Sequence, residues 1–407
     1  MTRSVPECRS TLWRGRAGCF LANGIVELTH LTGGGQIPEF RFRDLPESNP
    51  LWVPRWELRE PFEFRASRDS ARYGSPEVGR LLGAIAGHSL CLGTFGMPSD
   101  EEVRAGAVLH GEAGVLPWKS ILVRHEHSAE IRLSVRLPWA GFAFSRSVSL
   151  RRDESVVRVR ETVKNLLGVD QFLQWQQHVA LSPSFLVPQH AFVALPGHRG
   201  ITDPGGYEGH ELLARNREFV WPNAPGVAGG HRDLRRPFTR SGTGFVAGVE
   251  LDQRREYGFI SAVNRTLSIA FGCLFLRADF PWVTVWEENL ARKASPWNAA
   301  EQVRALEFGA SPLPTGRGEM VRRGNLFDLP ILVRLPAGGQ LNASYCMFLA
   351  RLPRNCQDVD DVACGENSIQ LLSTDDAQIA NLAAKGVRRL LQRRQSRRAG
   401  PIVGPGV

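Results

Sequence analysis

The fold is decided by residues 121–165, which read ILVRHEHSAEIRLSVRLPWAGFAFSRSVSLRRDESVVRVRETVKN. Apolar and polar residues alternate there with a period of two, the pattern of strands that bury one face. The alternating apolar positions are Ile131, Leu133, Val135, Phe142, Phe144, Val148, Leu150, Val157, Val159 and Val163. The polar run 152–155, Arg-Asp-Glu-Ser, separates two of these segments as a turn does. The stretch therefore predicts consecutive antiparallel strands.

Similar strand patterns occur on both sides of this stretch. They lie at 24–28, 36–42, 245–251, 257–262, 267–276, 331–335 and 341–349. Short strands separated by turn residues predict an all-β fold, a large antiparallel sandwich, because no strand alternates with a helix as in βαβ units. The triple glycine at 33–35 is followed by no Gly-Lys-Ser/Thr sequence, so it is interpreted as a hairpin turn and not as a phosphate loop.

The segments outside the strand pattern carry weaker predictions. Residues 43–80 are rich in Pro, Arg and aromatic residues and are expected to form an irregular loop. Ser99 followed by three acids is typical of a helix start. Residues 377–391 form an amphipathic pattern that predicts a short helix. We expect one β-sandwich domain over 1–352 and an extension over 353–407, with a disordered basic tail beyond Arg393.

Composition narrows the possible classes of protein. The chain has 407 residues, 43% of them hydrophobic and 22% charged, which is ordinary for a globular protein. It contains no run of about eighteen apolar residues, so no membrane-spanning helix is expected, and its N-terminus lacks the apolar core of a secretory signal. Seven scattered cysteines without metal-ligand spacing favour a reducing compartment, and we predict a cytoplasmic protein without a bound metal.

The net charge of +9 is concentrated near the C-terminus. Seven basic residues lie between Lys385 and Arg398 with no acid among them, and removing them leaves +2 for the remainder. A basic tail can bind RNA or an acidic surface without specificity. Because the rest of the chain is near neutral, a solubilising tail is favoured and a nucleic-acid partner is not expected.

Three motifs occur in a characteristic order. The first is Val-Leu-His110-Gly-Glu-Ala at 108–113, followed by Trp118; the second runs from Glu161-Thr-Val-Lys-Asn165 to Gln177-His178; the third is Ala-Leu-Glu307-Phe-Gly at 305–309. The turn Pro-Ala-Gly-Gly at 336–339 follows the third motif. In this order they resemble the galactose mutarotase-like superfamily, which includes aldose 1-epimerases and hexose-6-phosphate mutarotases, over roughly residues 20–350.

The resemblance implies a β-supersandwich and a set of catalytic roles. Glu307 would be the base that takes the proton from the anomeric hydroxyl, and His178 the acid that protonates the ring oxygen. His110 would hydrogen-bond the sugar near that oxygen. A base with a raised pKa and an acid titrating near neutrality suit ring opening and re-closure, which need no cofactor.

Further residues are candidates for contact with the sugar. We expect His88, Trp118, Gln177, Trp286 and Glu288 to contact it, although a tryptophan beside apolar strands is more often part of a core. Glu287 and Glu288 compete with Glu307 as the base, and Glu307 is favoured because its neighbours are apolar. Arg80, Asp203 and Asp233 are candidates for the family's sugar-binding arginine and aspartate. Glu112 stands near the position of an arginine in the hexose-phosphate members, which argues against phosphate recognition.

The leading prediction is an aldose 1-epimerase-like isomerase that interconverts the anomers of a free sugar. The alternative is a carbohydrate-binding protein on the same fold without efficient catalysis. The retained His110, His178 and Glu307 favour the enzyme, whereas the unplaced arginine and aspartate favour the binding protein. The sequence specifies neither the sugar nor the oligomeric state.

Overall fold

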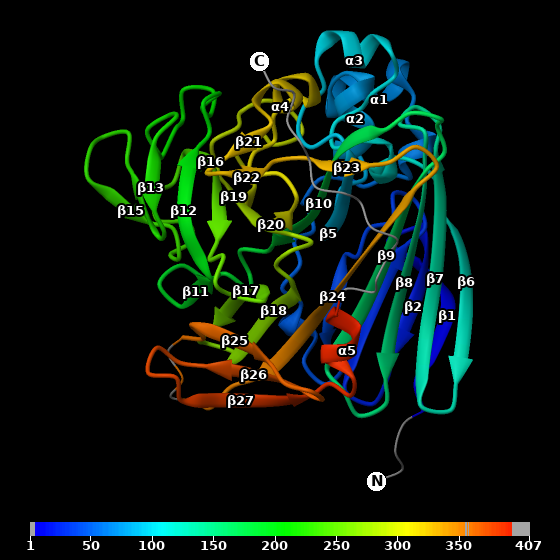
Figure 1. The fold of residues 1–407 in the computed structure, drawn as a ribbon, viewed down its shortest axis with the longest axis vertical. Helices are drawn as coiled ribbons and strands as arrows, with labels where there is room; N and C mark the ends of the chain where they lie inside the picture. Colours follow the sequence, from blue (N-terminus) through cyan, green and yellow to red (C-terminus); the bar gives the residue numbers. More distant parts are fainter. Residues whose placement is uncertain (1–4, 355, 357, 393–407) are drawn as a thin grey trace.

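The computed structural model describes residues 5–354, 356 and 358–392. Its centre is two eight-stranded sheets packed face to face, with every pairing between their strands antiparallel (Figure 1). Sheet I contains, in spatial order, β13 (Glu218–Val220), β12 (Gly197–Thr202), β16 (Thr243–Leu251), β19 (Trp282–Asn289), β20 (Gln302–Gly309), β10 (Gln171–Leu181) and β23 (Val333–Leu335), and β5 (His88–Gly93) also pairs with β10. Sheet II contains β11 (Ala191–Ala194), β17 (Tyr257–Asn264), β18 (Ile269–Leu276), β24 (Gln340–Arg351), β9 (Val156–Asn165), β8 (Phe142–Arg151), β7 (Ser128–Leu137) and β6 (Lys119–His125).

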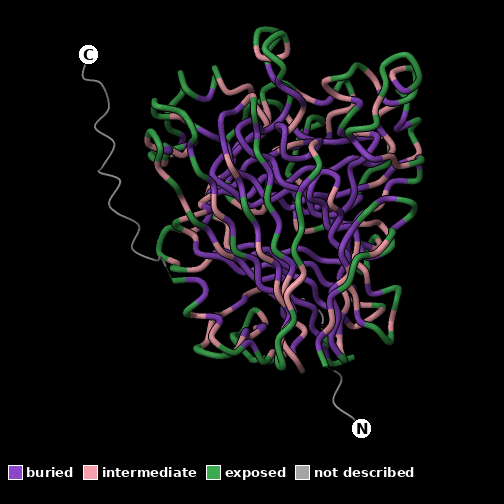
Figure 2. The backbone as a smooth tube through the Cα atoms, turned by 90° about the vertical axis from the view of Figure 1, so that its right-hand side faces the viewer, coloured by how far each residue is buried: buried purple, intermediate pink, exposed green. Residues whose placement is uncertain are grey.

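The core lies between the inner faces of the two sheets. The ten apolar positions whose alternation predicted strands in residues 121–165 are all buried there, which confirms the all-β prediction. The turn predicted at 152–155 joins β8 to β9. Figure 2 shows buried chain filling the interior while the loops at both ends of the sandwich are exposed. The period of two therefore sets which side chains face the core.

Strand β10 is central to sheet I. It pairs with β20 along one edge and with β5 and β23 along the other. In the pairing with β20, His178 lies directly opposite Glu307. Residues distant in the sequence are thus held side by side by a backbone ladder.

A third sheet of four strands covers one side of sheet II near the N-terminus. Its strands are β1 (Glu7–Trp13), β2 (Arg16–Ala22), β3 (Val26–Leu31) and β4 (Glu39–Phe42), and the glycines at 33–35 lie in the turn between the last two. Two short two-stranded ribbons are formed by β14 (Asn223–Pro225) with β15 (His231–Asp233), and by β21 (Asn325–Leu326) with β22 (Leu329–Pro330).

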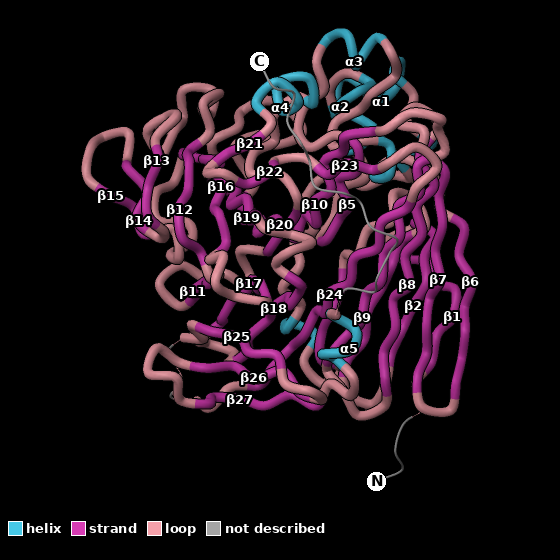
Figure 3. Tube along the Cα trace, viewed as in Figure 1, coloured by secondary structure: helices cyan, strands magenta, loops and turns pink. Residues whose placement is uncertain are grey.

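Four short helices gather at one end of the sandwich (Figure 3). They are α1 (Ala66–Tyr73), α2 (Pro76–Leu82), α3 (Asp100–Arg104) and α4 (Arg317–Arg323). The helix start expected at Ser99 is confirmed, since Ser99 and Glu102 form a capping box. The irregular loop expected over 43–80 is wrong in part, because α1 lies within it and α2 begins within it. The sequence Ser-Pro-Glu at 75–77 is a helix start, with proline at the first helical position.

The C-terminal extension packs on the outer face of sheet II. A three-stranded sheet of β25 (Asp361–Cys364), β26 (Ser368–Leu372) and β27 (Gln378–Ala383) is followed by α5 (Val387–Leu391). Apolar residues of the extension, including Ile369, Leu371 and Leu391, share a buried cluster with Phe259 and Phe348 of sheet II. The extension predicted to begin after residue 352 therefore shares a hydrophobic core with sheet II.

The helix predicted over 377–391 is wrong in its first half. Residues 378–383 form β27, because β26 offers its backbone groups as partners and tertiary pairing outweighs helix propensity. The helix begins only after Gly386, which has a left-handed conformation. The disordered tail expected beyond Arg393 lies outside the described residues.

Candidate functional site

The candidate site is built on the outer face of sheet I, away from the sandwich core. Strand β10 alternates, so Leu173, Trp175 and Val179 point into the core while His178 points to the opposite face. Glu307 is placed likewise between Leu306 and Phe308, which both face the core. The His178 Nε2 and Glu307 Oε1 atoms are 3.8 Å apart, and the two residues are only 2% and 3% exposed.

His110 covers this pair from a turn near α3. It has φ +60°, and the next residue, Gly111, has φ +84°. A side chain on Gly111 would put a Cβ 2.3 Å from the Leu92 carbonyl oxygen, so glycine is required at this turn. The His110 Nδ1 accepts a hydrogen bond from the Gly96 N–H at 3.1 Å. The His110 ring centroid lies 5.4 Å from that of His178, and the structure thus brings His110, His178 and Glu307 together.

Burial controls the protonation of all three side chains. It lowers the pKa of His178 to about 4 and raises the pKa of Glu307 well above its usual value. Burial also lowers the pKa of His110 well below the ordinary value, and the charges of His178 and Arg292 act in the same direction. Perturbed acids and imidazoles that face one another are the usual components of a proton-transfer site.

Trp286 and Glu288 flank the pair on the same face of sheet I. The Trp286 ring centroid is 5.7 Å from that of His178. The Trp286 Nε1 donates to the Tyr207 hydroxyl at 3.0 Å, and that hydroxyl donates to Glu288 Oε2 at 2.6 Å. Glu288 Oε1 also accepts the backbone N–H of Arg292. Glu288 is therefore engaged by the protein itself.

Arg292 and Tyr207 belong to this site but were not predicted from the sequence. The Arg292 guanidinium carbon lies over three aromatic rings, 4.9 Å from the Tyr207 centroid, 5.0 Å from that of Trp297 and 5.7 Å from that of Trp286. Its side chain is 30% exposed. The only signal in the sequence was the position of Arg292 four residues after Glu288, in the Trp-rich segment that precedes Glu307.

Three predicted sugar contacts lie elsewhere, in a polar network inside the core. Gln177 Nε2 donates to Glu161 Oε2 at 2.6 Å, and Gln177 Oε1 lies 3.0 Å from His88 Nε2. Glu161 is also paired with Arg146, whose guanidinium carbon lies 5.3 Å from the Trp118 ring centroid. Because this network faces sheet II, His88, Gln177 and Trp118 are separated from His178 by the backbone of sheet I. They are not retained as sugar contacts.

The other candidates are placed apart from the pair or are engaged by other groups. Glu287 points into the core and pairs with Arg304, so it does not face the histidines. Asp233 pairs with Arg235, and Arg80 is exposed on α2. Glu307 is therefore the acid that the structure sets opposite His178.

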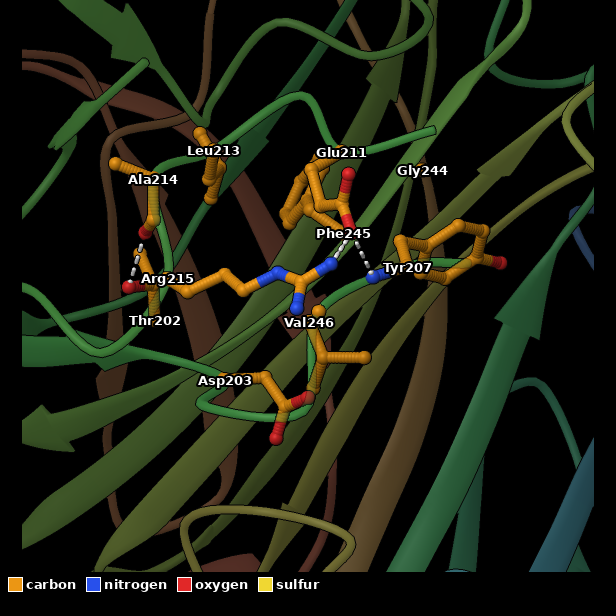
Figure 4. A pocket seen from close by; sticks show the side chains of 11 residues that line it. Thr202, Asp203, Tyr207, Glu211, Leu213, Ala214, Arg215, Gly244, Phe245 and Val246 are labelled. Carbon is orange, nitrogen blue, oxygen red and sulfur yellow. Dashed lines mark hydrogen bonds and ion pairs between the residues drawn. The ribbon is translucent and has the colours of Figure 1, made fainter. Parts of the chain in front are cut away.

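Asp203 lines a small hollow beside Tyr207, which Figure 4 shows from close by. Arg215 crosses this hollow to reach Glu211, and the Tyr207 hydroxyl points away from it toward Glu288. Burial raises the pKa of Asp203. Tyr207 belongs to both the hollow and the candidate site. His110, His178 and Glu307 do not line the hollow.

Comparisons with known proteins were informative only at the level of structure. No family model and no curated protein matches the sequence. A candidate aldose 1-epimerase from Klebsiella pneumoniae superposes with a TM-score of 0.58 at 13% identity, covering 82% of this chain and 79% of that one. A galactose mutarotase-like protein from Clostridium acetobutylicum gives a TM-score of 0.56 at 12% identity, covering 86% and 99%.

This chain has the galactose mutarotase-like fold. A candidate mutarotase from Salmonella typhimurium agrees, with a TM-score of 0.53 at 10% identity, covering 85% of this chain and 94% of its own. The fold predicted from the three motifs is thereby confirmed. Identities this low establish the architecture of the chain and not its chemistry.

Within residues 5–354, 356 and 358–392, no group of three or more His, Cys, Asp or Glu side chains is arranged to hold a metal ion. Over the same residues, no helix has the length and apolar character needed to cross a bilayer.

Proposed function

We propose that this protein is an aldose 1-epimerase-like isomerase that interconverts the anomers of a sugar by acid–base ring opening. The observation that carries the proposal is the opposition of His178 and Glu307 across β10 and β20, with His110 above them. Mutarotation needs one group to take a proton from the anomeric hydroxyl while another gives a proton to the ring oxygen. Two such groups on adjacent strands can reach both oxygens of one sugar ring.

Neighbouring side chains give the proposed site the character of a sugar-binding surface. Trp286 offers an apolar ring beside His178, of the kind on which the C–H face of a sugar can pack. Arg292 is held over aromatic rings and lies 3.7 Å from Glu288 through its Nε atom, and its partly exposed side chain supports a role in contacting sugar hydroxyls. No cofactor is part of the proposal, because the reaction only moves protons and rotates one bond.

Polarimetry or NMR on freshly dissolved α-anomers tests the proposal. Glucose, galactose, mannose and xylose are mixed with enough protein to outrun spontaneous mutarotation. We expect catalysis with at least one sugar, and a fall in turnover of about 10²–10⁴ in Glu307→Gln and His178→Asn. Glu126→Gln and His127→Asn change exposed residues of the same types and are the matched controls. Unchanged turnover in both site variants would remove the pair from the mechanism.

The alternative function is non-catalytic carbohydrate binding. The near-complete burial of His178 and Glu307 favours it, because a sugar must displace covering groups to reach them. This alternative predicts no turnover by the natural protein. Sugar affinity, measured by calorimetry, would then respond to Trp286→Ala and remain unchanged in Glu307→Gln.

Location in the cytoplasm remains part of the proposal. The seven cysteines are free thiols, two of them partly exposed, which suits a reducing compartment. Fractionation of the native source with a tagged copy tests it, and recovery from an oxidising compartment would contradict it.

A further inference from the structure

The loop that joins β19 to β20, residues 290–301, lies beside the candidate site. Both of these strands contribute side chains to the site. Arg292 of this β19–β20 loop lies over the Trp286 ring, 5.7 Å from its centroid, and is close enough to His110 for its charge to lower the pKa of that imidazole. Since Trp286 and His110 both face His178, the loop forms the next layer outside the site.

The inner side of the β19–β20 loop is held by stacked aromatic rings. Residues 293–295 and 298–299 are exposed, whereas Trp297 between them is buried. The Trp297 ring is parallel to that of Trp52, with centroids 6.0 Å apart, and meets the Trp286 ring edge to face at 6.0 Å. Such ring pairs are favourable, but they have no fixed register and can separate and re-form. The loop therefore rests on the site through one large side chain.

The backbone of the β19–β20 loop is bonded largely to itself. The Ala299 N–H donates to the Arg292 carbonyl oxygen at 2.7 Å, which draws the two arms of the loop together. The Ser295 hydroxyl donates to the Arg72 carbonyl oxygen of α1 at 2.8 Å, which ties the outer side of the loop to the body. Because its backbone bonds are internal and its ties to the body come from side chains, the loop can move as one unit.

Both ends of the β19–β20 loop have unfavourable backbone conformations. Leu290, directly after β19, has φ +61°, and Asn298 and Ala299, shortly before β20, each have φ +51°. The left-handed region is unfavourable for residues with a Cβ atom, most of all for a bulky side chain such as leucine. Residues at the ends of a moving segment absorb the change in backbone dihedral angles, and the strain is relieved when they leave this region.

We propose that the β19–β20 loop is a lid, hinged at Leu290 and at Asn298–Ala299, that lifts Trp297 off Trp286 to open the site and then closes again. The movement does not depend on the proposed function, whereas the identity of the guest, a sugar, rests on it. His178 and Glu307 are only 2% and 3% exposed beneath the closed loop, so opening would give a sugar its access. Closure would then keep water away from the open-chain aldehyde.

Hydrogen–deuterium exchange of the natural protein without sugar tests the movement. The hydrogen-bonded amides of residues 297–300 should exchange at a rate that sub-denaturing urea leaves unchanged, because a local opening exposes little new surface. The ladder amides of β10 and β20 should exchange more slowly and accelerate with urea. Loop amides as slow and as urea-dependent as those of β20 would overturn the proposal, since the loop would then open only when the whole fold does.

Acylation by diethyl pyrocarbonate, measured at His178 by mass spectrometry, tests whether the opening uncovers the site. Trp297→Leu should accelerate this acylation by at least about tenfold, because the ring pairs that hold the loop closed are lost. Trp221→Leu changes a loop tryptophan that follows β13 and should leave the rate unchanged. If Trp297→Leu did not fold, Ser295→Ala would release the tie to α1 and give a smaller acceleration. Equal rates in the natural protein and the loop variant would overturn the proposal.

A sugar that proves to be a substrate should slow exchange at residues 297–300, because it holds the lid closed. Unchanged exchange with such a sugar would refute the role of the lid in sugar binding. A protein that failed every mutarotation assay could still show the urea-independent exchange and the faster acylation. The proposed function would then fail separately from the movement of the loop.

Discussion

Replacing Glu307 by glutamine should stabilise the folded protein above about pH 4.5. In the unfolded chain Glu307 ionises near its ordinary value of 4.5, whereas burial holds its pKa well above that value in the folded protein. A raised folded pKa contributes stability that is present below 4.5 and is lost as the pH rises toward the folded pKa. Glutamine has nearly the same shape and no such loss.

The size of the effect follows from proton linkage. Across this interval the folded state holds one more proton than the unfolded state, so the free energy of unfolding falls by about 1.4 kcal/mol per pH unit. The advantage of Glu307→Gln over the natural protein should grow at that rate and level off above the folded pKa. His178, with a pKa lowered to about 4, costs stability as the pH falls below about 6.5. That loss is common to both proteins and cancels in the difference.

Urea unfolding followed by tryptophan fluorescence at half-unit steps from pH 4 to 8 measures this difference. Glu126→Gln, whose carboxyl group is exposed, should give a curve parallel to that of the natural protein. If the Glu307→Gln curve were also parallel, the carboxyl group would ionise in the folded state as freely as in the unfolded chain. The reasoning about its protonation would then be refuted.

Three further predictions concern other parts of the molecule. Gly111→Ala should lower turnover of any accepted sugar at least about tenfold, because the added Cβ meets the Leu92 carbonyl and displaces His110. The helix and strand content measured by circular dichroism should change little. Activity equal to that of the natural protein would show that the position of His110 does not matter for turnover. Arg146→Met should destabilise the fold by about 3–5 kcal/mol in urea unfolding, since Glu161 would stay buried without its cation, and Arg132→Met on the exposed side of β7 is the control. Truncation after Gln392 should leave the melting temperature unchanged, whereas truncation after residue 358 should lower it by several degrees, because the second removes the apolar cover of Phe259 and Phe348.

The fold could be predicted because period-two alternation states which face of each strand is buried. The same alternation also indicates on which face of a strand each candidate site residue lies. In β10 the apolar positions Leu173, Trp175 and Val179 share their parity with Gln177, so Gln177 faces the core and His178 the opposite side. Gln177, predicted as a sugar contact, instead joins the core network of Glu161 and His88.

Other features depended on contacts that a sequence does not display. Arg292 and Tyr207 meet because β16 pairs with both β12 and β19, which places the loop after β12 beside the loop after β19. Residues 378–383 became a strand because β26 lay beside them, although their own pattern favoured a helix. The composition of residues 43–80 favours a loop, but Ser75 followed by Pro76 is a local helix-start signal for α2, whereas α1 follows Arg65, whose side chain makes no capping hydrogen bond.

The position of β24 has a consequence for how the protein is made. This strand, residues 340–351, lies between β18 and β9 and joins the two blocks of sheet II, which are otherwise unpaired. During synthesis on the ribosome, the hairpins that precede residue 340 keep open strand edges until β24 has emerged. Open edges invite pairing with other chains, and pairings so distant in sequence form slowly. The nascent chain should therefore depend on chaperones until residue 351 clears the exit tunnel.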